Sequence, residues 1–183
     1  MANKGRLIVI SGPSGAGKGT VLAEVFKANP QMKYSVSATT RKPRPGEENG
    51  VQYFFITKEE FEAKIRRGEM LEHAVYCDNY YGTPADFVEE QRVKGYDIVL
   101  EIEPCGAMQV KQKCPDAVSI FILPPSVEEL ERRLVNRGTE EASVVAERIT
   151  QAKKEIPMAE KYDFKVVNDD YLRAANEINH IIK

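Results

Sequence analysis

The chain has few cysteines, and their arrangement excludes two classes of small protein. Cys77, Cys105 and Cys114 are odd in number and form no C-x-x-C pair. A disulfide framework needs paired cysteines and a zinc motif needs closely spaced ones, so neither is indicated. We therefore expect reduced thiols and a cytoplasmic protein.

The chain also lacks an excess of one charge and a long hydrophobic run. Lys and Arg number 26 against 28 Asp and Glu, and the net charge of −2 provides no global field for nucleic acid or anionic membrane. The first apolar run, Leu7–Ile10, is too short for a signal peptide, and no stretch approaches a membrane span. We expect no nucleic-acid or membrane partner, so any anionic ligand must be held by a local charge cluster.

The remaining composition is typical of one folded domain, since 42% of the 183 residues are hydrophobic and 30% are charged. Short apolar runs alternate with helical periodicity, which favours an α/β fold with a parallel sheet flanked by helices. The candidate buried strands of this sheet are Leu7–Ile10, Ile98–Ile102, Val118–Leu123 and Phe164–Val167.

Local sequence signals predict where several helices begin and end. The first helix ends near Asn29, which precedes a proline. Thr83-Pro84 predicts another start, with proline at the first helical position, and Gly95 predicts its end. Two capping boxes start further helices, Thr57 with Glu60 and Ser126 with Glu129.

The segment from about residue 34 to residue 83 has a different pattern. Its strand candidates alternate polar with aromatic residues, and one helix, around Lys58–Arg67, interrupts them. This predicts a small, half-exposed sheet inserted into the α/β core, with strands at Tyr34–Ser37, Tyr53–Ile56 and Leu71–Tyr76. Arg137–Glu140 is a second candidate insertion, between two helical stretches.

The segment Gly12–Thr20 carries the strongest chemical signal. It lies between the apolar run Leu7–Ile10 and a helical pattern, and this order of strand, glycine loop and helix is typical of a phosphate-binding loop. Lys18 adds a mobile positive charge for the β- and γ-phosphates. The hydroxyl that usually follows the lysine comes one position later, at Thr20, so Mg²⁺ could be bound there directly or through water.

A second cluster indicates a second phosphate site. Arg41 and Arg44 lie three residues apart in a proline-rich loop, where two guanidinium groups could hold a phosphate bidentately. Taken alone, a solvated basic loop is the more common explanation for this segment, and a surface carboxylate on an exposed strand is the more common one for Glu72. Glu72 and the nearby Asn79–Thr83 place a carboxylate, phenols and hydroxyls in the same inserted segment, which favours a ligand site.

The ordered motifs resemble those of the guanylate kinase family across essentially the whole chain. They are the phosphate loop, S-x-T-T-R-x-P-R, N-G-x-x-Y, N-Y-Y-G-T, R-G-T-E and a late N-D-D. The resemblance implies Mg²⁺-dependent transfer of the γ-phosphoryl group of ATP to GMP, and also to dGMP, in purine nucleotide metabolism. It implies one domain, with a core at residues 1–33, 84–125 and 156–183, a GMP-binding segment at about 34–83 and a lid at about 126–155. The chain would act as a monomer or homodimer.

The resemblance assigns the GMP-binding residues individually. The phosphate would be held by Arg41, Arg44, Tyr53 and Tyr81, and the guanine contacted by Ser37, Glu72 and Thr83. Guanine presents N1–H and N2–H₂ as adjacent donors, which one carboxylate accepts as a pair. Adenine would place a lone pair against Glu72, at a cost of about 1–3 kcal/mol for each unsatisfied group.

The resemblance likewise assigns the ATP-binding and catalytic residues. The ATP phosphates would be held by Gly12, Pro13, Ser14, Gly15, Ala16, Gly17, Lys18, Gly19 and Thr20. Arg133 would lie near the phosphates or adenine and Asn168 near the base, although a solvated helix face paired with Glu128 and Glu129 explains Arg132-Arg133 nearly as well. The catalytic groups would be Lys18, Arg41, Arg137 and Arg148.

Two carboxylates end the apolar run before residue 104. Glu101 is a candidate Mg²⁺ ligand together with Thr20, and Glu103 is a candidate GMP contact. Family members commonly carry aspartate at the position of Glu103, followed by an apolar residue and glutamine, where this chain has Pro104-Cys105.

Two other functions compete with this interpretation. A non-catalytic interaction module with the same fold would be expected to lose Lys18 or the arginines at positions 137 and 148, and this chain keeps them. A kinase of another phosphorylated small molecule, such as a ribose bisphosphate, would not need the donor and acceptor set of Ser37, Glu72 and Thr83.

Overall fold

The computed structural model describes residues 4–136 and 142–183. The described residues form two compact units. The first comprises the N-terminal residues up to Leu7 together with Gln31–Leu100 and Cys105–Ala117, and the second comprises Ile8–Pro30, Glu101–Pro104 and the described part of Val118–Lys183. No helix within the described ranges is long and apolar enough to cross a membrane.

The larger sheet confirms the predicted α/β fold, with five strands in the order β2-β7-β1-β8-β9. The pairs β2–β7, β1–β8 and β8–β9 are parallel. Every residue of β1 is buried, as expected for a parallel strand covered by helices on both faces. The bounds are β1 (Leu7–Ser11), β2 (Met32–Tyr34), β7 (Asp97–Glu101), β8 (Val118–Leu123) and β9 (Phe164–Val167).

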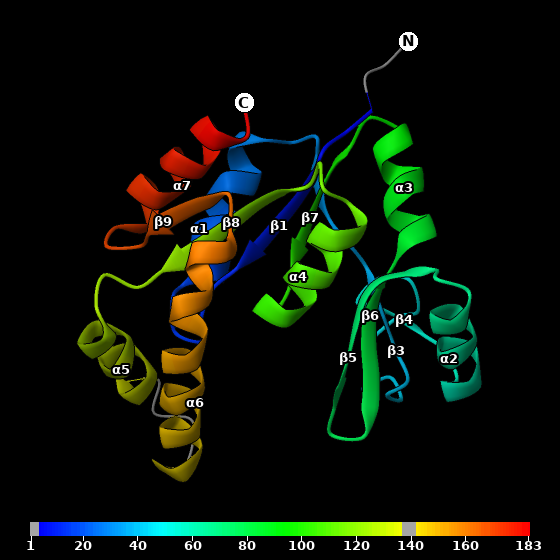
Figure 1. Ribbon diagram of the computed structural model, residues 1–183, viewed down its shortest axis with the longest axis horizontal. Helices are drawn as coiled ribbons and strands as arrows, with labels where there is room; N and C mark the ends of the chain where they lie inside the picture. The colour runs from blue at the N-terminus through cyan, green and yellow to red at the C-terminus, as the bar shows by residue number, and fades with distance from the viewer. Residues whose placement is uncertain (1–3, 137–141) are drawn as a thin grey trace. The chain divides into compact units, whose positions relative to one another are not determined.

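The helices of the second unit bury apolar residues at helical spacing. Helix α1 (Lys18–Ala28) has Asn29 as its C-cap, as predicted, and it packs beside α7 (Tyr171–Ile181) (Figure 1). Asn29 Nδ2 donates to Asn179 Oδ1 at 2.7 Å. Helices α5 (Val127–Asn136) and α6 (Ala142–Glu155) share a small core, and a 3₁₀ helix, η1 (Ile156–Lys161), follows.

A second, smaller sheet is present in the predicted segment, which confirms the predicted small sheet. Its order is β4-β3-β6-β5, in which β5–β6 and β3–β6 are antiparallel and β3–β4 is parallel. Phe61 of α2 packs against Ala38 and Met70 beneath this sheet. The bounds in the first unit are β3 (Ser37–Thr39), β4 (Tyr53–Phe55), α2 (Lys58–Arg66), β5 (Met70–Tyr76), β6 (Asn79–Pro84), α3 (Ala85–Val93) and α4 (Pro104–Lys113).

One strand prediction was wrong here, and one strand was missed. The predicted strand Tyr34–Ser37 is divided, because the chain ends β2 of the larger sheet at Tyr34 and begins β3 of the smaller sheet at Ser37. Strand β6 was missed, and it extends through Pro84. Helix α3 therefore begins one residue later than predicted, with Pro84 as an extended N-cap at φ −64° and ψ 125°.

The remaining helix signals act as predicted, with one exception. Thr57 and Glu60 make both hydrogen bonds of a capping box, and Gly95 follows α3 at φ +89°. The Ser126 hydroxyl accepts the N–H of Glu129 at 3.1 Å. The carboxylate of Glu129, which a full capping box would turn back on residue 126, instead binds Arg132 and Arg133.

Candidate functional site

The phosphate loop turns sharply between β1 and α1. Gly15 and Gly17 have φ values of +86° and +82°, a conformation that favours glycine. A Cβ atom at Gly17 would also lie 2.4 Å from Nδ2 of Asn168. Gly17 is the N-cap of α1 and offers no side-chain oxygen to the first-turn N–H groups, so this helix end is suited to an anion.

A polar cavity of about 250 Å³ opens at this loop. It gathers most of the predicted loop and both candidate metal ligands, being lined by Ser14, Gly15, Gly17, Lys18, Gly19, Thr20 and Glu101. Gly12, Pro13 and Ala16 are buried beside it. Thr20 lies in the first turn of α1, and Glu101 ends β7.

Lys18 is held by the loop itself. Its Nζ donates to the carbonyl oxygens of Gly12 at 2.7 Å and Pro13 at 3.2 Å. These neutral acceptors are weaker partners for an ammonium group than phosphate oxygens. The lysine can therefore turn from the loop carbonyls to a bound phosphate.

Asn168 contacts the phosphate loop through its side-chain amide. Its side chain is buried, and Nδ2 donates to the carbonyl oxygen of Ala16 at 2.7 Å. Arg133 donates from Nη2 to the Asn168 carbonyl at 3.1 Å and from Nε to Glu129 at 2.8 Å. Arg132 pairs with the same carboxylate on the solvated face of α5, which agrees with the alternative reading of that arginine.

Arg137 and Arg148 are the two remaining arginines with a predicted catalytic role. Arg137 lies outside the described residues, together with the candidate insertion Arg137–Glu140. Arg148 is half-buried on α6. Their predicted roles in catalysis stay predictions.

The smaller sheet places the predicted guanine ligands together. Glu72 of β5 lies directly opposite Thr83 of β6, and the Thr83 hydroxyl donates to Oε1 of Glu72 at 2.7 Å. Glu72 is only 7% exposed and Thr83 is fully buried. A buried carboxylate is costly unless polar partners surround it. The alternative reading of Glu72 as a surface carboxylate was therefore wrong.

The predicted phosphate ligands gather at the neighbouring strands. Ser37 pairs with Tyr53 across β3 and β4, and the rings of Tyr53 and Tyr81 meet edge to face at 6.0 Å. The Arg41 guanidinium lies 5.5 Å from the Tyr53 ring centre. Arg44 is exposed in the same loop.

Glu47 is a member of this cluster that the sequence analysis missed. Its carboxylate accepts both arms of the Arg41 guanidinium at 2.9 Å and the backbone N–H of Arg44 at 2.7 Å. The bonds from Arg41, and then the N–H of Arg44, hold the pKa of Glu47 below its usual value of 4.5. The same pairing raises the pKa of Arg41. Its position six residues after Arg41, within the proline-rich loop, was the available signal.

Glu103 is exposed between β7 and α4. The following Pro104 is the first residue of α4, where the missing N–H of proline costs no helical hydrogen bond. The departure from the family pattern at Pro104 is thus accommodated by the start of the helix.

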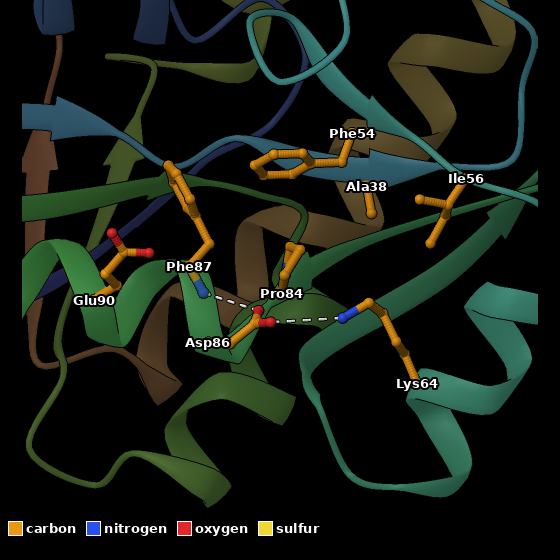
Figure 2. A pocket seen from close by; sticks show the side chains of 8 residues that line it. All are labelled: Ala38, Phe54, Ile56, Lys64, Pro84, Asp86, Phe87 and Glu90. Carbon is orange, nitrogen blue, oxygen red and sulfur yellow. Dashed lines mark hydrogen bonds and ion pairs between the residues drawn. The ribbon is translucent and has the colours of Figure 1, made fainter.

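A second cavity, of about 290 Å³, lies in the first unit, which also contains the smaller sheet (Figure 2). Its strand residues Ala38, Phe54 and Pro84 each follow a predicted GMP ligand by one position. Since successive strand side chains point to opposite faces, this cavity lies on the reverse face of the smaller sheet. Apolar groups dominate its lining, so it is unsuited to a nucleoside monophosphate.

Comparison with known proteins gives a consistent result. The family model described as "Guanylate kinase" matches residues 4–183. Guanylate kinases of Streptococcus pneumoniae and Streptococcus agalactiae are each 55% identical over 184 residues, which cover 100% of this chain and 88% of each relative. The crystal structure of guanylate kinase from Anaplasma phagocytophilum matches with a TM-score of 0.73 at 34% identity, covering 100% of this chain and 86% of that one. A Bacteroides thetaiotaomicron shikimate kinase, at 18% identity and a TM-score of 0.50, shares the fold.

Proposed function

This chain belongs to the guanylate kinase family and phosphorylates GMP from ATP, and we propose that it does so with Mg²⁺ and also accepts dGMP. The observation that carries the proposed base recognition is the buried pair of Glu72 and Thr83, 2.7 Å apart. The carboxylate accepts N1–H and N2–H₂ of guanine, and the hydroxyls of Ser37 and Thr83 complete the base site. The GMP phosphate displaces Glu47 from Arg41 and is held with Arg44, Tyr53 and Tyr81.

The phosphate loop supplies the donor side of the proposed reaction. The N–H groups at the start of α1 and the Lys18 ammonium bind the ATP phosphates, while Arg133 on α5 and Asn168 directly after β9 support the loop. Phosphoryl transfer requires little covalent chemistry from the protein, so positioning and charge stabilisation dominate. Lys18, Arg41, Arg137 and Arg148 would supply the positive charge around the transferring group.

Thr20 and Glu101 fit the proposed Mg²⁺, because both line the phosphate-loop cavity and offer the oxygen ligands that this cation prefers. Among residues 4–136 and 142–183, no group of three or more His, Cys, Asp or Glu could hold a metal by itself. Phosphate oxygens and water would complete the coordination. When bound, Mg²⁺ neutralises the charge that develops on the β- and γ-phosphates.

The proposed setting is purine nucleotide metabolism in the cytoplasm, with the chain acting as a monomer or homodimer. The described cysteines support a reducing compartment, since all three are free thiols. In the proposed division of the chain, residues 34–83 bind GMP, residues 126–155 form the lid, and residues 1–33, 84–125 and 156–183 form the core. Glu103 is proposed as a further GMP contact.

A coupled assay of ADP formation with GMP, dGMP, AMP, CMP and UMP tests the proposal. We expect turnover with GMP and dGMP only, and loss of turnover when EDTA removes the divalent cation. Folded protein that forms no GMP-dependent ADP would refute the activity. Full activity in EDTA would refute only the proposed role of Mg²⁺. Inactivity with dGMP would refute only the wider substrate range.

A further inference from the structure

One face of α4 contacts the strand that carries Glu72. Gly106, Gln109 and Lys113 follow one another at spacings of three and four residues, which places them on the same side of the helix. We call these three residues the α4 face. Each of them lies against β5 within three residues of Glu72, and all belong to the same compact unit.

Gly106 makes room for the carboxylate of Glu72. A Cβ atom at position 106 would lie 2.9 Å from Oε2 of Glu72 and 3.4 Å from its Cδ. Glycine is less favourable than alanine inside a helix, so its presence here needs a local reason. The close approach of Oε2 supplies that reason, since no other residue leaves this space empty.

Gln109 occupies the open edge of β5. This strand lies at the end of the smaller sheet, where backbone groups that point away from β6 need other partners. The Gln109 side chain accepts the N–H of His73 through Oε1 and donates to the carbonyl of His73 through Nε2, both at 3.1 Å. One amide thus satisfies both backbone groups of the residue after Glu72.

Lys113 holds the other side of Glu72. Its Nζ donates to the carbonyl oxygen of Met70 at 2.6 Å, two residues before Glu72. The strand pairing shifts register between Met70 and Glu72, and such irregularities change the direction of a side chain. Gln109 and Lys113 therefore fix the backbone on both sides of an irregular position.

We propose that Gly106 is a specificity-determining residue for guanine and that Gln109 is a positioning residue acting through Glu72. The inference rests on the proposed contact between Glu72 and guanine. Two adjacent donors on a flat base require a carboxylate with a fixed plane. Thr83 sets one oxygen of that carboxylate, and the space at Gly106 sets the other. Displacing the plane of the Glu72 carboxylate removes its hydrogen bond to the 2-amino group of the base. GMP has this amino group and IMP lacks it.

Gly106→Ala tests the specificity role directly. We expect the ratio of kcat/KM for GMP over IMP to fall about tenfold, because one charge-assisted hydrogen bond is lost. The KM for ATP should stay unchanged, and the melting temperature should not fall. Cys105→Ala, at the exposed neighbouring position on the same helix, is the matched control and should keep the wild-type ratio. An unchanged ratio in Gly106→Ala would overturn the proposal.

Gln109→Met tests the positioning role independently of any change at Gly106. We expect the KM for GMP to rise several-fold while the KM for ATP and kcat change little. Gln112→Met, at an exposed position three residues further along the same helix, is the control. Equal changes in the KM values for GMP and ATP would show a merely structural role and refute the positioning one.

A double-mutant cycle separates this inference from the function on which it rests. Glu72→Asp shortens the carboxylate by one methylene and relieves the contact at position 106, so adding Gly106→Ala to it should cost little more. Additive losses would contradict the proposal. If Glu72→Gln leaves the preference for GMP over IMP intact, the guanine contact itself is wrong. If Glu72→Gln abolishes the preference and Gly106→Ala does not change it, the contact stands and the role of Gly106 is refuted.

Discussion

Arg41, a proposed ligand of the GMP phosphate, is paired with a carboxylate of its own loop. Glu47 binds both arms of the guanidinium, which also lies near the rings of Tyr53 and Phe55. Carboxylate and phosphate present similar paired oxygens to this fork. A GMP phosphate can therefore replace Glu47 without requiring Arg41 to find a new conformation.

This pairing predicts a specific acid response. The pKa of Glu47 is lowered in the folded state, mainly by Arg41 and then by the N–H of Arg44. Its contribution to the free energy of unfolding is thus present above the ordinary pKa of 4.5, and it is lost as the pH falls below that value. The free energy of unfolding of Glu47→Gln should therefore fall less on acidification than that of the wild type. Urea unfolding at about pH 6 and at about pH 3, one to two units on either side of the ordinary carboxyl pKa, measures the difference.

Glu48→Gln is the control for that measurement, because Glu48 is the adjacent, exposed carboxylate. It should leave the wild-type pH dependence in place. An NMR titration of Glu47 gives a second check, with an expected midpoint below 4.5. A midpoint at or above that value would contradict the pairing in solution.

At the level of elements, the turn after β9 and the phosphate loop depend on each other through Asn168. Its amide binds the Ala16 carbonyl, and Gly17 must be glycine partly because that amide lies where a Cβ would be. The N–H of Asn168 donates to the Leu123 carbonyl at 2.8 Å, which ties the same residue to β8. The shape of the loop is therefore set by residues about 150 positions away in sequence.

Asn168→Ala should loosen the phosphate loop. We expect a loss of about 1–3 kcal/mol in the free energy of unfolding, because the buried Ala16 carbonyl loses its donor. The KM for ATP should rise more than the KM for GMP. Asn176→Ala, at an exposed position on α7, should change neither value. Equal increases in the two KM values would contradict a role specific to the loop.

The strands also show which elements of the fold could be predicted from the sequence. Strands β1, β7 and β8 were found because buried parallel strands are continuous apolar runs. Strand β9 was found by the same signal, but its prediction as a buried strand was wrong, because it lies at the edge of the sheet and only Val166 is buried. Strand β6 was missed because its sequence, N-Y-Y-G-T-P, has neither an apolar run nor a regular alternation, and β2 has only three residues. Both are specified by their neighbours in the sheet.

The candidate site shows a corresponding division. The phosphate loop and the pair of Glu72 and Thr83 were recognisable from spacing and motif. Gly106 and Gln109 were not, since their roles arise from contacts that only the folded chain creates. Glu47 had only its position in the loop of Arg41 as a signal, and its pairing is seen in the folded chain alone. A glutamine at one position of an ordinary helix carries no signal that it will complete the edge of a distant strand.

For the whole molecule, the two groups of ligand residues belong to different compact units. The proposed GMP-binding residues lie in the first unit, and the phosphate loop lies in the second. Damage to one group should therefore leave the binding function of the other intact. This separation makes the two substrates testable one at a time.

Lys18→Ala should abolish turnover and leave the fold and GMP binding intact. At a GMP concentration of about 100 times its Kd, ligand binding should stabilise both wild type and the variant by about 2.7 kcal/mol. The stabilisation by ATP should be strongly reduced in the variant alone. Differential scanning calorimetry measures both effects. Near-normal turnover, or loss of the GMP effect in the variant, would contradict this division of roles.

The proposed contact between Glu72 and the guanine base is the basis of GMP recognition. Calorimetric titration of wild type and Glu72→Gln with GMP and with ATP tests it most directly. The amide keeps the size of the side chain but cannot accept two donors as a carboxylate does, so GMP affinity should fall about ten- to a hundredfold while ATP affinity is unchanged. An equal loss of affinity for both nucleotides, or no loss for GMP, would contradict the account.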